Sequence, residues 1–289
     1  MGFKSIKENL KWALKRHPLL YYIRFALISK NLQKKDSAIP TFNDLNPKQE
    51  APELFYKVSK DLPMTPEMDE FDKVLVIIKY LNNFQIKGSP GLGLSSDKMM
   101  QLLLDGTDGG VCSDHSQLFN VFCVVNDIQV REWGVVDKFY DAQFGHTFNE
   151  IYSTRLKKWI LIDAWLSITF HAAESTEPLS VVETFDHLRK GIPIEHRTIH
   201  KTVSELTRIP LIYSKEARPF VISYYSNKVY DTYLNRYQDK YPGFLINAML
   251  ILVGKNYKFL FVMDDYKSLL FPFLKKKAVK FRDISIFAG

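Results

Sequence analysis

The sequence predicts an α+β protein in which a helix packs against an antiparallel β-sheet. An apolar helical pattern begins at Cys112, directly after two glycines. Residues 128–136 alternate between apolar and polar side chains, as a strand does, and residues 146–152 and 159–165 have the character of two more strands. A short polar turn at residues 153–158 joins the last two, so we expect them to form a hairpin.

The size and composition of the chain are those of an ordinary globular protein. It has 289 residues, of which 46% are hydrophobic and 25% are charged, enough for one large domain or for a core with an added subdomain. We expect a basic helical region and linker at residues 1–65, a core at residues 66–175 that carries the chemistry, and a C-terminal α/β extension at residues 176–289 that packs on this core.

The N-terminal segment carries the positive charge of the chain. Residues 1–35 hold nine basic side chains and one acidic one, against a net charge of +7 for the whole protein. Residues 3–17 place apolar side chains on one helical stripe, and a second helix follows to about Leu32. An anionic membrane surface or polymer is one partner that fits residues 1–35, and a solvated helix face is the other interpretation.

The N-terminal segment does not have the pattern of an export signal, because Arg24 interrupts its apolar stretch. We therefore expect a cytoplasmic protein that can associate peripherally with a membrane. We expect no nucleic-acid partner.

The remaining elements follow from periodicity and from breaker residues. Residues 34–52 contain three prolines and indicate a linker, whereas Glu70–Phe84 repeats apolar residues every three or four positions, as a helix does. Further predicted elements are a short helix capped at Ser96 or Asp97 that runs through Leu104, a helix at 180–190, and a hairpin made of residues 249–253 and 257–263.

The two cysteines are predicted to be unpaired. Cys112 and Cys123 on one helix would be about 16 Å apart along its axis, and a disulfide requires Cα atoms within about 7 Å. The same separation argues against a zinc site shared by both thiols. Cys123 lies in an apolar run, which indicates a structural role. We expect the protein to use no metal and no organic cofactor.

Three residue types in sequence order suggest nucleophilic catalysis. Cys112 supplies a thiol, His146 an imidazole and Asp163 a carboxylate, which fit a nucleophile, a base and the group that orients the base. A hairpin closed between residues 152 and 157 would place His146 directly opposite Asp163, close enough for a hydrogen bond. The other interpretations are an inert buried thiol, a core histidine and a carboxylate at a surface strand end.

The setting of Cys112 favours its thiolate form. A helix N-terminus directs amide N–H groups and the positive end of the helix dipole towards the sulfur. The Cys112 N–H could also contribute to an oxyanion hole, for which Gln101 is a conceivable second donor.

The three segments together resemble the transglutaminase-like superfamily, which is related to papain and uses a Cys-His-Asp triad. Residues 110–114 are similar to its Gly-x-Cys-x-Asp start, residues 146–152 to its strand with histidine, an aromatic residue and an acid, and residues 159–163 to its Trp-x-x-x-Asp strand. The resemblance covers residues 70–170. It implies a papain-like core in which the nucleophile helix packs on an antiparallel sheet.

The resemblance also implies an activity. Cys112 would attack an amide or ester carbonyl of an acyl donor, with His146 as base and then acid and Asp163 orienting it. The acyl group would pass to an amine acceptor, giving a new amide. The alternatives are an amidase or peptidase that uses water, a binding module without activity, and a peripheral membrane scaffold.

Four neighbouring residues have more than one interpretation. His115 either packs in the core or tunes the thiol, and packing is favoured. Asp114 is expected to accept hydrogen bonds from backbone amides near the helix start. Trp133 and Trp165 could line an acyl-binding cleft, although tryptophan in strands usually belongs to the core.

Overall fold

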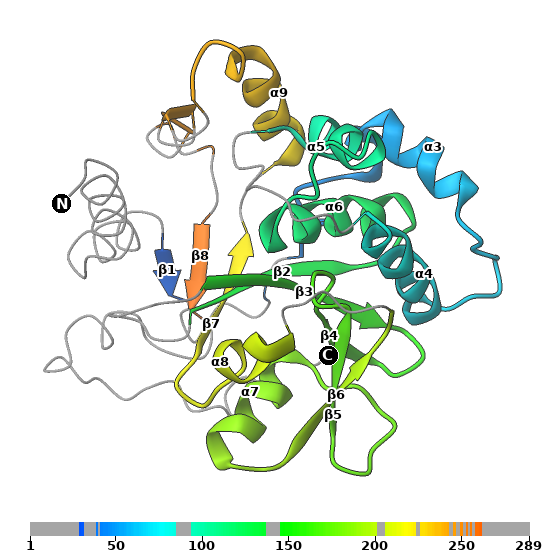
Figure 1. Cartoon of the computed structure of the whole chain (residues 1–289), viewed down its shortest axis with the longest axis vertical. Coiled ribbons are helices and arrows are strands. Elements are labelled where there is room, and N and C mark those ends of the chain that lie inside the picture. The colour runs from blue at the N-terminus through cyan, green and yellow to red at the C-terminus, as the bar shows by residue number, and fades with distance from the viewer. Residues whose placement is uncertain are drawn as a thin grey trace, which may run out of the picture.

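The chain folds as a mixed α+β structure around a six-stranded sheet in the order β1-β8-β7-β2-β3-β4 (Figure 1). The computed structural model describes residues 29–31, 39, 41–84, 94–136, 145–200, 206–223 and 226–242, parts of 245–255, and 258–261. The sheet is antiparallel except where β1 runs parallel to β8. Its strands are β1 (Ser29–Asn31), β2 (Val130–Val136), β3 (Gly145–Ser153), β4 (Lys158–Ile162), β7 (Arg218–Ser223) and β8 (Lys258–Phe261).

Helices cover one face of the central strands. They are α3 (Glu53–Asp61), α4 (Glu70–Asn82), α5 (Ser96–Leu104) and α6 (Cys112–Val125), which lie together above β2 and β3 in Figure 1. Their apolar side chains form one buried cluster with residues from one face of the strands, among them Val130, Ile151 and Ile160. Successive side chains of a strand point to opposite faces of the sheet, so the strand residues next to these three point into a second cluster.

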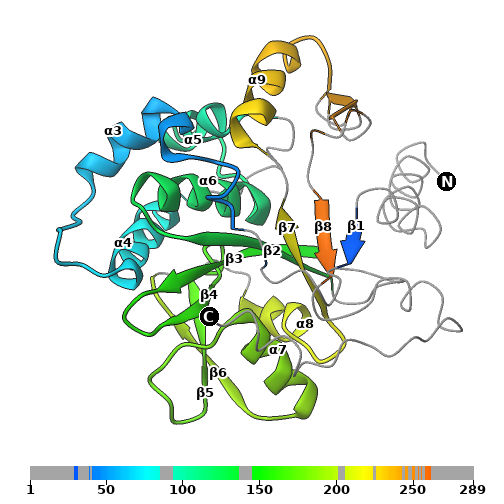
Figure 2. The ribbon, with the colours of Figure 1, turned by 180° about the vertical axis from the view of Figure 1, so that it is seen from behind.

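The second cluster lies on the opposite face of the sheet. Trp133, Phe148 and Leu161 pack there against α7 (Val181–Lys190), α8 (Ile209–Ile212) and the two-stranded sheet of β5 (Ile168–Ala172) and β6 (Ile194–Thr198). Figure 2 shows α7 and α8 on the side of the sheet away from α3–α6. The central strands β2, β3 and β4 are therefore covered on both faces, which explains why every residue of β2 is buried.

Segments beyond residue 175 complete the central sheet. Strand β7 pairs with β2, and β8 pairs with β7. Helix α9 (Asn227–Tyr237) contacts α5, since Asp231 accepts hydrogen bonds from the backbone N–H and the hydroxyl of Ser96 at the start of that helix. The predicted boundary between the core and the C-terminal extension, at residues 175 and 176, therefore separates β2 from β7, although these strands pair in one sheet.

Most helices and strands predicted for residues 70–190 are found. Asp69 caps α4 by accepting from Asp72 N at 2.8 Å, and Ser180 caps α7 through the Glu183 backbone. Helix α5 begins at Ser96, so its N-cap is Ser95 rather than the predicted Ser96 or Asp97. The strands predicted at 128–136 and 146–152 correspond to β2 and β3, and β4 ends at Ile162, three residues before the predicted end. Helices α3 and α9 and strands β5, β6 and β7 were not predicted.

The segment predicted to be a linker is packed in its described part. The Phe42 amide donates to Val130 O at 2.8 Å, and the Asn43 side chain bonds the backbone of Ile128 and Val130. A short 3-10 helix, η1 (Lys48–Glu50), follows. The prolines prevent a long helix here, and the Asn43 side chain ties the segment to Ile128 and to Val130 at the start of β2.

Two predictions near the chain ends are wrong. The second N-terminal helix does not reach Leu32, because Ser29–Asn31 forms β1, held by backbone pairing with β8. The first arm of the hairpin at 249–253 is also absent, since Met249 and Leu250 are helical and Leu250 packs with Ile246 against α9. The predicted helix at residues 3–17 lies outside the described residues.

The hairpin of β3 and β4 has a different register from the predicted one. Ser153 pairs with Lys158 and Asn149 with Ile162, so the turn begins one residue later. This shifts the pairing by two residues along one strand, and His146 is not directly opposite Asp163. A shift of two keeps every side chain on its face of the sheet. The two residues therefore remain diagonal neighbours on one face.

In the ranges that the structure describes, no helix combines the length and the apolar character needed to cross a membrane.

Candidate active site

Cys112 is the first residue of α6 and is partly exposed. It packs at the margin of the second apolar cluster, whereas almost all of α6 after Ser113 is buried. The first amide groups of a helix have no acceptor within it, so the N–H groups of Cys112 and Ser113 point out of the helix at its start. The thiol is thus accessible and lies at the positive end of the helix dipole.

Gly110 and Asp114 fix the turn that delivers Cys112. Gly110 has φ +65°, which glycine adopts without strain, and its N–H donates to Asp108 Oδ1 at 2.9 Å. Asp114 Oδ2 accepts from the Val111 N–H at 2.8 Å, so this carboxylate holds the residue before the helix. The expectation that Asp114 serves backbone amides is confirmed.

His146 lies between the thiol and the carboxylate. Its Nε2 is 2.6 Å from Asp163 Oδ2, and the Cys112 side chain lies close enough to the ring to raise its pKa. Because Nε2 faces Asp163, Nδ1 is the nitrogen available to the sulfur. The predicted contact between His146 and Asp163 is present, although it forms across a diagonal rather than between paired residues.

The two carboxylate oxygens of Asp163 have different partners. It directly follows β4, and its backbone pairs with Ile168 to close a turn in which the Leu166 N–H donates to Asp163 Oδ1 at 2.8 Å. Asn82 of α4 holds the same turn by donating to Ala164 O at 3.1 Å. Asp163 is fully buried, which excludes its interpretation as a surface acid. Because Oδ1 accepts from the Leu166 N–H, Oδ2 is the oxygen that faces His146.

The electrostatics of the site favour an imidazolium. Burial lowers the pKa of His146, but the Asp163 carboxylate and the Cys112 sulfur raise it by more, to about 10. At neutral pH the ring therefore carries a proton on both nitrogens, and Nε2 donates to Asp163 Oδ2. An imidazolium beside a thiol stabilises the thiolate form that acts as a nucleophile.

Tyr213 is a site residue that sequence reasoning missed. Its hydroxyl donates to Asp163 Oδ2 at 2.7 Å, the same oxygen that faces His146. The residue follows α8, in the part of the sequence where no motif was evident. Its neighbourhood in the sequence, Leu211-Ile212-Tyr213, resembles any apolar stretch, so no local signal distinguishes it.

Other candidates have different roles. Gln101 is exposed and donates to Asp105 Oδ1, which contradicts its assignment as an oxyanion donor. Trp133 is fully buried and donates from Nε1 to Glu150, as a core residue does. Cys123 is fully buried, and burial raises the pKa of its thiol well above the ordinary value. Both cysteines are free, as predicted.

His115 packs behind the site rather than in it. Its Nε2 lies 2.9 Å from Gly109 O, and its ring meets Trp165 edge-on at 4.7 Å between centroids. Burial lowers the pKa of His115 to about 4, so it is neutral at physiological pH. It supports the glycine turn before Cys112, and Trp165 belongs to the buried cluster.

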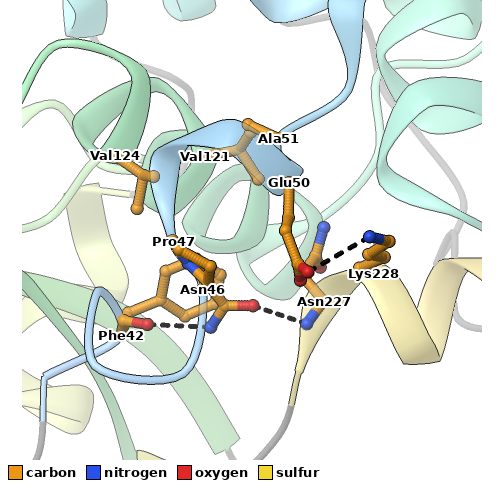
Figure 3. A pocket seen from close by; sticks show the side chains of 9 residues that line it. All are labelled: Phe42, Asn46, Pro47, Glu50, Ala51, Val121, Val124, Asn227 and Lys228. Atoms are coloured by element: carbon orange, nitrogen blue, oxygen red, sulfur yellow. Dashed lines mark hydrogen bonds and ion pairs between the residues drawn. The ribbon is translucent and has the colours of Figure 1, made fainter.

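A pocket lies away from this site, between the segment before α3, helix α6 and the start of α9 (Figure 3). Polar contacts span it: Asn46 Oδ1 accepts from the Asn227 N–H, and Lys228 pairs with Glu50 at 3.1 Å (Figure 3). None of its lining residues is Cys112, His146 or Asp163. The pocket lies where the start of α9 meets α6 and residues 42–51.

Comparison of the chain with protein-family models, with curated proteins and with solved structures found no match.

Proposed function

We propose that this protein is a thiol-dependent acyltransferase with a transglutaminase-like core. One observation carries the proposal: the partly exposed thiol of Cys112 lies beside His146, whose ring is hydrogen-bonded to the buried carboxylate of Asp163. This order of groups suits a nucleophile, a base and an orienting acid. The thiol alone is accessible, and its two partners are buried, as an attack on an external substrate requires.

In the first half of the reaction, the Cys112 sulfur attacks the carbonyl carbon of an amide or ester. A C–S bond forms, and the carbonyl electron pair moves to oxygen, where the Cys112 N–H at the helix start can donate to it. The tetrahedral intermediate collapses and the bond to the leaving group breaks. His146 gives its proton to the leaving amine or alcohol, which leaves a thioester on Cys112.

In the second half, an acceptor attacks the thioester. Neutral His146 takes a proton from the attacking amine, a new amide forms, and the sulfur leaves as the thiolate. Asp163 holds the imidazole in one orientation throughout. If water attacks instead, the product is a free acid, and the protein is an amidase or peptidase. No step of this scheme uses a metal or an organic cofactor.

A binding module that uses the same cleft is the alternative from another class. The buried His146–Asp163 pair argues against it, because such a pair costs desolvation energy that a binding surface does not need. The basic residues 1–35 fit an enzyme that acts near an anionic surface, and this remains a prediction from charge.

The experiment is acylation by a simple activated ester. The protein is incubated with p-nitrophenyl acetate, and the acyl group is located by peptide mass spectrometry. We expect acetylation at Cys112 in the wild type and in Cys123→Ala, and none at this position in Cys112→Ala. Adding a primary amine should then speed the loss of the acetyl group and give the acetylated amine. A thiol that is never acylated would favour the binding module.

Amine and water are separated by the same experiment. Loss of the acetyl group at a rate independent of amine concentration, with acetate as the product, would replace the transferase with a hydrolase.

A further inference from the structure

Tyr213 occupies the centre of an aromatic cluster beneath the candidate site. Its ring lies 4.4 Å from Phe170, 5.6 Å from Phe148 and 5.9 Å from Phe185, between centroids. The side chain is almost fully buried. A hydroxyl in such surroundings is costly unless it has a hydrogen-bond partner, and here that partner is Asp163 Oδ2 at 2.7 Å.

The Asp163 carboxylate therefore has three donors. Oδ1 accepts from the Leu166 N–H, and Oδ2 accepts from both His146 and Tyr213. Two donors on one oxygen compete for its electron density. A carboxylate that shares its charge with a second donor attracts the proton of the first less strongly.

We propose that Tyr213 is a positioning residue which shares Oδ2 of Asp163 with His146 and so weakens the hold of the carboxylate on the proton of His146. The inference rests on the proposed acyl transfer, in which His146 must release that proton to a leaving group and recover it from an acceptor. Acid–base catalysis works best when a group neither holds nor loses its proton too firmly at the working pH. Tyr213 moderates a pairing that would otherwise bind the proton too tightly.

The charged and titratable groups around His146 support this assignment. Asp163 and Cys112 face the ring directly, and Tyr213 meets it edge-on with centroids 6.4 Å apart. Burial and the Asp163 carboxylate raise the pKa of Tyr213 well above its ordinary value, so its hydroxyl stays protonated and donates. The carboxylate of Glu150, on the same strand as His146, accepts hydrogen bonds from Trp133 Nε1 and from the Val181 N–H at the start of α7.

The test is the pKa of His146, read by NMR of protein labelled at the histidine ring carbons, in wild type and in Tyr213→Phe. We expect the pKa of His146 to rise by about one unit in the variant, a tenfold gain in proton affinity. Tyr56→Phe is the matched control, because it also removes one tyrosine hydrogen bond, to Lys48 O, far along the chain from the site. It should leave the pKa of His146 unchanged.

Two further proteins keep the test decisive. In Asp163→Asn the pKa of His146 should fall, and adding Tyr213→Phe to that variant should have no further effect, because the hydroxyl acts through the carboxylate. Replacing tyrosine by 3-fluorotyrosine during expression makes the phenol a stronger donor without removing it. That substitution should lower the pKa of His146, which covers the case in which Tyr213→Phe does not fold.

The outcomes separate the inference from the proposed function. An unchanged pKa of His146 in folded Tyr213→Phe, together with a lowered pKa in Asp163→Asn, would overturn the role of Tyr213 and leave the triad standing. If the pKa shifts as expected but p-nitrophenyl acetate never acylates Cys112, the coupling of Tyr213 to His146 holds and the acyltransferase fails.

Discussion

The turn before Cys112 gives a prediction whose size follows from the structure. In Gly110→Ala the new methyl group would lie 3.0 Å from Asp114 Cβ and 3.1 Å from Met99 Cε, at a φ of +65°. An L-residue in the left-handed region costs about 1–2 kcal/mol. The flexible end of Met99 can move away from the new methyl group. Asp114 belongs to α6, so its Cβ moves only if the first turn of that helix moves.

That shift endangers the hydrogen bond from the Val111 N–H to Asp114, and the loss of such a cap costs about 1 kcal/mol. We therefore expect Gly110→Ala to lower the free energy of unfolding by about 2–3 kcal/mol and, for a chain of 289 residues, the melting temperature by roughly 3–5 °C. Because the displaced segment carries Cys112, alkylation of this thiol by iodoacetamide at neutral pH should also slow.

Gly106→Ala is the matched control. Gly106 has the same φ of +65° and has no atom within 4 Å of the added methyl group. It should therefore show the backbone cost alone, about 1–2 kcal/mol, with Cys112 as reactive as in the wild type. The two proteins are compared by thermal unfolding and by the rate of alkylation. Equal melting temperatures and equal rates would refute the argument that Gly110 positions the nucleophile.

Three further predictions concern protonation and buried charge. Alkylation of Cys112 by iodoacetamide at pH 7 should be slower in His146→Ala than in the wild type, because the variant lacks the imidazolium beside the sulfur; equal rates would argue against an ion pair between these side chains. Glu150→Ala leaves Arg131 buried without its carboxylate and should cost about 3–5 kcal/mol in urea unfolding, and a cost below about 1 kcal/mol would contradict a buried pair. Burial raises the pKa of Asp231 from 3.8 to about 6, so its contribution to stability is complete below about pH 4 and is lost as pH rises through about 6. Asp231→Asn should thus gain on the order of 3 kcal/mol relative to the wild type between about pH 4 and pH 7, and a pH-independent difference would argue against that pKa.

The parts of the fold that could be predicted are those with local signals. Helix α4 repeats apolar residues at helical spacing and carries Asp69 as its cap, and α6 begins after a glycine turn. The contact between His146 and Asp163 was predicted from the turn length, and the actual register differs. The prediction of the contact survived because a shift of two residues preserves the faces of both strands.

The parts that could not be predicted depend on distant segments. Strand β1 consists of Ser29–Asn31, which has weak strand propensity, and exists because β8 supplies backbone partners. Tyr213 lies fifty residues beyond Asp163, and only tertiary packing brings its hydroxyl to the carboxylate. Gln101 was a candidate oxyanion donor by residue type, but its helix directs it to solvent and to Asp105.

The order of strands in the sheet has a consequence for how the protein is made. Synthesis delivers Cys112, His146 and Asp163 early, but the neighbour of β2 on one side is β7, which pairs in turn with β8, and both strands come from the last third of the chain. Until they emerge, β2 presents an open edge, and such an edge can pair with other chains. The parallel contact of β1 with β8 joins opposite ends of the described sequence, and pairing over such a separation is of the kind that slows folding. Truncation after residue 205 should therefore leave a chain that contains all three triad residues and aggregates.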